Sequence, residues 1–249
     1  PPKDKSIQAD PMLHVVITHY QDYCMVHPVA DENCPPNRDY VEMIEEWQNQ
    51  VGNNIFFYEY YWKINWLGLP WPLVHTIRKD IPWFKQQGYK GLYTQFTEQN
   101  VWTLFPNYYV AARLLWDADA DVDAMLEKMY DDLFGEGGKY MKSYYGLMEN
   151  QMAESGLHFP GNSIWYNPRQ KGCNALAIFT EDVLKKLRDY YEKAVAANSD
   201  RKVAKRLEKV GLSLEYTERM MRYARLREKS KQVTNPARAY ELAKEALQV

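Results

Sequence analysis

The first half of the chain alternates three apolar segments with three segments of helical spacing, and no other feature of the sequence constrains the fold as strongly. The apolar segments read as buried strands because they are rich in β-branched and aromatic residues: Leu13–Thr18, Ile55–Tyr61 and Lys90–Gln95. The segments predicted to be helices are Asn37–Val51, Leu73–Gln87 and Tyr108–Trp116. Strands that alternate with helices pair in parallel, so we expect an α/β fold.

Three such units do not close a (β/α)8 barrel, which needs eight strands. The chain begins Pro1-Pro2 without an initiator Met, which suggests a processed chain or a fragment. The C-terminal part of a TIM-like barrel, with the missing N-terminal part of the same protein as a partner, is one fold that fits this pattern. A doubly wound sheet is the alternative, although the G-x-G-x-x-G fingerprint of nucleotide-binding versions is absent.

The second half of the chain is predicted to be helical. Asp121–Phe134 and Lys139–Ala153 are amphipathic, and Thr180–Val249 is a charged segment of about three helices. The expected organisation is a catalytic-type partial barrel over residues 1–155, an irregular connector over 156–179 and a C-terminal helical bundle over 180–249.

Composition excludes some classes of function. A net charge of -2 gives no electrostatic reason for binding nucleic acid, and no apolar run approaches the roughly 20 residues that cross a bilayer. The chain has 8 Trp and 20 Tyr, which either fill the core or stack on the apolar faces of sugar rings.

Active sites of parallel α/β folds gather where strands end. Cleaving a glycosidic bond typically needs two carboxyl groups, and the candidates at strand ends are Glu59 and Glu98. A buried ion pair for Glu59 and a solvated loop position for Glu98 are the alternatives. The candidate substrate-binding residues beside them are His19, Asp22, His27, Tyr60, Tyr61, Trp62, Lys63, Gln95 and Trp102.

No cofactor or metal is expected. The run DADADVDAMLEK from Asp117 has Val where an EF-hand needs Gly, and its acids are better explained as helix caps. Cys24, Cys34 and Cys173 form no zinc-like CxxC pattern. Cys24 and Cys34 either pair, if the protein is exported, or are buried thiols.

Four stretches in order resemble a bacterial family numbered 4838 among the domains of unknown function, whose founding enzymes form glycoside hydrolase family 163. They are CMVHPVADENCPPN from Cys24, NNIFFYEYYWKINWLGLPWP from Asn53, IPWFKQQGYKGLYTQ from Ile81 and YYVAARLLWDADADVDAML from Tyr108. The resemblance implies a (β/α)8-type barrel and a secreted or periplasmic glycosidase acting on N-glycans that contain N-acetylglucosamine.

Several site positions carry over from this resemblance. Glu59 stands where the family has an Asp, Tyr60 and Gln95 match, and Lys63 replaces an Asn. Thr94 stands where many members have a Glu, so either Glu98 takes that role or this chain differs in specificity or activity. The competing hypotheses are a non-catalytic carbohydrate-binding protein on a degenerate barrel and a scaffold that binds a protein partner.

Overall fold

The computed structural model describes residues 1–248 except 2, 3, 5, 8, 11, 19–22, 63–65, 97–100 and 159–172. These residues form a mixed α/β fold, mostly helical, around a parallel sheet in the order β1-β2-β3. The strands are β1 (Val15–Thr18), β2 (Ile55–Glu59) and β3 (Gly91–Thr94). The three predicted strands and their parallel pairing are thus confirmed, although Tyr60 and Tyr61 lie beyond the end of β2.

The helices between the strands also follow the prediction, with one difference. They are α1 (Pro35–Val51), α2 (Val74–Gln86) and α3 (Val101–Trp116). Helix α3 begins seven residues earlier than predicted. It includes Pro106, a residue that usually ends a helix, within its first two turns. The N–H that Pro106 lacks would have bonded to the carbonyl of Trp102, and that carbonyl instead accepts a hydrogen bond from the hydroxyl of Tyr145.

The two faces of the sheet have different environments. Ile55, Phe57 and Glu59 alternate along β2 as fully buried side chains. Their face is covered by α1 and α2, since Phe57 packs in one apolar cluster with Ile44 and Phe84. On the opposite face, Val16 and Tyr93 are 47% and 50% exposed. Among the described residues, helices cover one face of the sheet, and the other, called the open face below, carries half-exposed side chains.

The second half of the chain is helical, as predicted. Its elements are α4 (Val122–Phe134), a 3-10 turn η2 (Gly135–Gly137), α5 (Gly138–Ala153), α6 (Ala175–Ile178), α7 (Glu181–Ala197), α8 (Arg201–Gln232) and α9 (Pro236–Leu247). Asp121 caps α4 by accepting from the N–H groups of Asp123 and Ala124, at 3.0 and 3.1 Å. The acids around it therefore include a helix cap, as the sequence analysis favoured. Among the described residues, no helix combines the length and the apolar character that spanning a bilayer requires.

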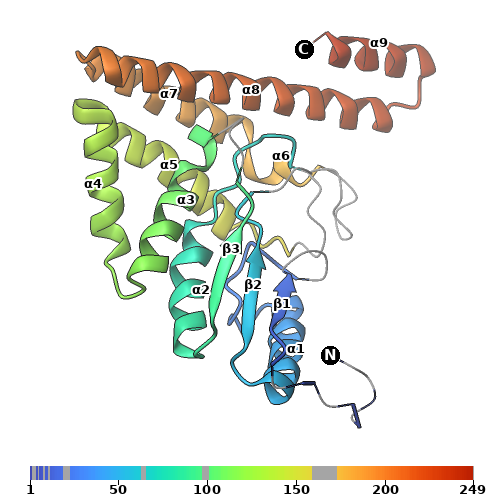
Figure 1. Ribbon diagram of the computed structural model, residues 1–249. Helices are drawn as coiled ribbons and strands as arrows, with labels where there is room; N and C mark the ends of the chain where they lie inside the picture. The colour runs from blue at the N-terminus through green and yellow to red at the C-terminus, as the bar shows by residue number, and fades with distance from the viewer. Residues whose placement is uncertain are drawn as a thin grey trace.

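Helix α8 lies beyond the carboxyl ends of the strands, which point toward it in Figure 1. Its side chains donate hydrogen bonds to backbone carbonyls of three distant segments. Arg206 donates to Leu133 at 2.8 Å, Tyr216 donates to Leu67 in the loop after β2, and Arg225 donates to Phe179 at 2.7 Å. Directed contacts therefore join α8 to the loop after β2 in the α/β part, and to two points of the helical part.

Candidate functional site

Glu59 and Thr94 lie side by side at the carboxyl ends of β2 and β3. Glu59 is 2% exposed and shares the helix-covered face of the sheet with Phe57. The Thr94 hydroxyl accepts a hydrogen bond from the backbone N–H of Tyr61 at 3.0 Å, which fixes the start of the loop after β2. Thr94 therefore has a positioning contact of its own.

Glu59 lies within a buried polar group that includes a second acid, Asp80 of α2. Burial raises the pKa of Asp80 well above its ordinary value, and the charge of Glu59 raises it further. Burial and then the charge of Glu59 likewise raise the pKa of Tyr40 and of Tyr61. The backbone N–H of Val29 donates to Oδ1 of Asp80 at 2.8 Å. The sequence analysis did not single out Asp80. Its helical spacing from Ile77 and Ile81 places it on the apolar face of α2, and this signal was present in the sequence.

Aromatic rings gather on the open face of the sheet. The rings of Tyr58 and Tyr93, paired across β2 and β3, are stacked with centroids 4.8 Å apart. Tyr60, which is 8% exposed and belongs to the apolar core, stacks on Tyr58 at 4.9 Å. The amide of Gln95 donates to the hydroxyl of Tyr58 at 2.7 Å. Two predicted site residues, Tyr60 and Gln95, are therefore brought together, by a tyrosine that the sequence analysis did not single out.

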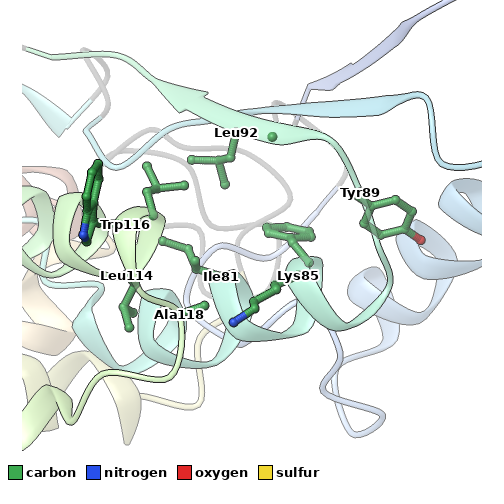
Figure 2. A pocket seen from close by; sticks show the side chains of 10 residues that line it. Ile81, Lys85, Tyr89, Leu92, Leu114, Trp116 and Ala118 are labelled. Carbon is green, nitrogen blue, oxygen red and sulfur yellow. The ribbon is translucent and has the colours of Figure 1, made fainter.

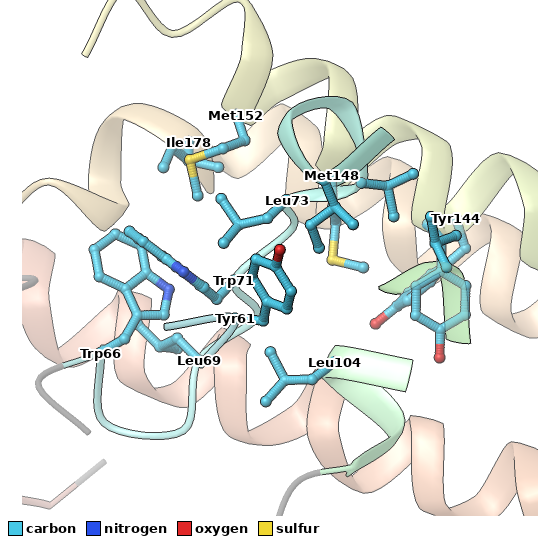
Figure 3. Close-up of a cluster of buried hydrophobic side chains, with 14 of the residues drawn as sticks. Tyr61, Trp66, Leu69, Trp71, Leu73, Leu104, Tyr144, Met148, Met152 and Ile178 are labelled. Carbon is cyan, nitrogen blue, oxygen red and sulfur yellow. The ribbon is translucent and has the colours of Figure 1, made fainter. Parts of the chain in front are cut away.

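Three other predicted residues contact the protein's own core. Tyr61 is 2% exposed and lies among Leu73, Leu104 and Met148 (Figure 3). Trp62 is half-buried against the same cluster. Trp102 is half-buried in α3, with its ring stacked on Phe105 at 5.7 Å.

His27 lies in the loop after β1 and contacts a histidine from a distant part of the chain. Its ring stacks on His158 with centroids 4.5 Å apart, and its Nδ1 lies 3.3 Å from Oδ2 of Asp31. Burial is the main reason that the pKa of His27 is lowered, and His158 lowers it further. The other predicted site residues lie outside the described part of the chain: His19, Asp22, Lys63 and Glu98. The predicted distance between the carboxyl groups of Glu59 and Glu98 therefore lies outside it as well.

Cys24, Cys34 and Cys173 are buried as thiols. The Cys34 sulfur lies 3.2 Å from Nδ1 of His158. A hydrogen bond with Cys24, followed by burial, raises the pKa of Cys34 far above its ordinary value. A thiol of this kind is a poor nucleophile at neutral pH, which argues against a catalytic Cys–His pair.

An apolar pocket of about 280 Å³ lies between α2, β3 and the end of α3 (Figure 2). Ile81, Leu92 and Trp116 line it, and Lys85 at its rim pairs with Asp119 at 2.7 Å. The pocket meets β3 at Gly91 and Leu92, at the amino end of the strand. It therefore lies away from the strand end that carries Thr94 and is not part of the candidate site.

Comparison with known families decides the relationship of this chain. A family model described as Domain of unknown function (DUF4838) matches residues 1–146. The chain belongs to the DUF4838 family. The match covers the sheet and the helices from α1 to α4 of this DUF4838 protein. Searches of the curated proteins and of the solved structures each returned no match.

The segment CMVHPVADENCPPN of this DUF4838 protein is held together by one side chain, Asn37 of α1. Its Oδ1 accepts from the N–H of Cys24 at 2.9 Å, and its Nδ2 donates to the carbonyls of Cys24, His27 and Pro28 at 2.9–3.0 Å. Asn37 is 0% exposed, so these bonds are shielded from water. The spacing of the motif is therefore explained by a loop that folds back onto the first turn of α1.

Proposed function

We propose that this DUF4838 protein binds a glycan at the carboxyl ends of its strands, as part of the active site of a glycoside hydrolase. The observation that carries the proposal is the stacked pair of Tyr58 and Tyr93 near the carboxyl ends of parallel strands. A half-exposed tyrosine ring offers the apolar face of a sugar a stacking partner. The hydrogen-bonded Gln95 beside it supplies the polar group that orients such a ligand.

The proposed chemistry uses Glu59 and Glu98 as the carboxylate pair. Glu59 is the last residue of β2 and is 2% exposed, so in this proposal it acts from the carboxyl end of the strand, where active sites of parallel α/β folds gather. The proposed substrate class is a glycan that contains N-acetylglucosamine. In the proposed architecture the sheet continues into a TIM-like barrel, because β1 and β3 each have one edge without a partner strand among the described residues.

Binding by the tyrosine pair is tested with Tyr93→Ala. We expect its affinity for an N-acetylglucosamine oligosaccharide, measured by titration calorimetry, to fall about tenfold or more, which corresponds to about 1.4 kcal/mol. The matched control is Tyr240→Ala, because Tyr240 is an exposed tyrosine on α9. An equal affinity for both variants would show that the ring pair only stabilises the sheet.

Hydrolysis is tested separately, with an aryl β-N-acetylglucosaminide and a complex N-glycan as substrates. We expect Glu59→Gln and Glu98→Gln each to lower kcat at least about a hundredfold, because each would remove a group that transfers a proton or attacks the sugar. A kcat for hydrolysis that is unchanged in both variants would rule out this carboxylate pair.

The second candidate function is carbohydrate binding without turnover. The enclosure of Glu59, at 2% exposure, and the positioning contact of Thr94 favour it. Its signature is retained glycan affinity with no released product from the unmodified protein.

A further inference from the structure

Two cysteines and one histidine from separate segments meet in the interior of the protein. Cys24 comes from the loop after β1, Cys34 immediately precedes α1, and His158 follows the end of α5. One ligand atom from each of these residues lies within 4.8 Å of those of the other two. Both cysteines are 0% exposed. The histidine is 124 positions from Cys34 in sequence, so the cluster is a product of the fold and not of a local motif.

The backbone around the cluster is held independently of it. The four hydrogen bonds of Asn37 fix the backbone of Cys24, His27 and Pro28. The carbonyl of Cys34 accepts from the N–H groups of Asn37 and Arg38, at 3.0 and 3.1 Å, as α1 begins. His158 is held by the stacked ring of His27. The side chains are therefore positioned in advance by contacts that do not involve their own sulfur and nitrogen ligand atoms.

The cluster is close in size to the coordination shell of a thiophilic cation, with its ligand atoms all within 4.8 Å of one another. In tetrahedral zinc sites, with Zn–S near 2.3 Å and Zn–N near 2.0 Å, neighbouring ligand atoms are about 3.5–3.8 Å apart. The contact of 3.2 Å between Cys34 Sγ and His158 Nδ1 is within a small adjustment of that value.

We propose that Cys24, Cys34 and His158 form a binding site for a zinc-type divalent cation, with a water molecule as the fourth ligand. Such a site joins the loop after β1 to the chain that follows α5, because Cys24 and Cys34 belong to the first and His158 to the second. It thereby stabilises the relative positions of the α/β part and the helical part. The site is independent of the proposed glycan chemistry.

The test uses zinc itself as the probe. The 249-residue chain, reduced and stripped with a chelator, is reloaded with zinc sulfate, desalted and analysed by mass spectrometry for metal. We expect about one zinc ion per chain, a melting temperature that rises on loading, and a thiolate-to-metal absorption band when cobalt replaces zinc. Cys34→Ser is expected to lose at least about 90% of the bound metal. The matched control, Cys173→Ser, removes a buried cysteine outside the cluster and is expected to keep the full stoichiometry.

Three results would overturn the proposal. The first is an unmodified, reduced chain that holds no zinc after loading. The second is an equal loss of zinc in Cys34→Ser and Cys173→Ser. The third is a single reactive thiol in the denatured, unreduced chain, which would show that Cys24 and Cys34 form a disulfide instead. Should Cys34→Ser fail to fold, His158→Ala gives the same comparison from the histidine side.

Discussion

Replacing Asn107 by alanine is expected to lower the free energy of unfolding by about 3 kcal/mol, because it leaves buried backbone groups without partners. Asn107 of α3 is 2% exposed and makes three hydrogen bonds to the chain after β2. Its Oδ1 accepts from the N–H of Leu73 at 3.0 Å, and its Nδ2 donates to the carbonyls of Tyr61 and Trp71 at 3.2 and 2.7 Å. Urea unfolding of the variant and the parent measures the difference.

The control for this substitution is Asn33→Ala, at an exposed position before α1. It should change the free energy of unfolding by less than about 0.5 kcal/mol. If the two variants were equally stable, the hydrogen bonds of Asn107 would make no net contribution to stability, and the loop after β2 would be held by its other contacts.

Replacing Asp80 by asparagine is expected to stabilise the protein at pH 8 and not at pH 4. An unfolded aspartate has a pKa of about 3.9, whereas the folded pKa of Asp80 is raised by burial and by Glu59. The contribution of Asp80 to stability is therefore complete below the unfolded pKa and is lost as pH rises through the folded pKa. Asparagine does not ionise and can still accept the hydrogen bond from Val29, so the variant avoids this loss.

The measurement is urea unfolding of Asp80→Asn and the parent at both pH values. The advantage of the variant at pH 8 over pH 4 is expected to be at least about 1 kcal/mol. Asp39→Asn, at an exposed position on α1, is the matched control and should show almost no difference between the two pH values. An advantage of Asp80→Asn that does not grow with pH would mean that Asp80 is ionised in the folded protein.

The regular part of the fold could be predicted because apolar spacing reports burial directly. Strands β1, β2 and β3 each contain residues of a short apolar run, and α1 and α2 show one apolar face. The early start of α3 could not be predicted, because the tolerance of Pro106 depends on Tyr145, a residue of another helix. Local helix propensity does not predict that the Trp102 carbonyl finds a hydrogen-bond donor in a residue so distant in sequence.

The candidate site was predictable in part. The burial of Glu59 follows from its position in an apolar strand, and the period of two in a strand would also have placed it on the face of Phe57, away from Tyr58. The aromatic pair needed the register of β2 and β3, which sequence alone does not fix. His158 could not be foreseen as a neighbour of Cys34, since only the packing of α5 brings them together.

The three hydrogen bonds from α8 have a mechanical consequence. A single helix of 32 residues holds the end of α4, the loop after β2 and the residue after α6 at separate points along its length. Unfolding of the whole helix would release all three contacts at once. We therefore expect the first and second halves of the chain to lose their protection against amide hydrogen exchange together. Protection that fades in α8 well before it fades in β2 would show that the two halves open independently.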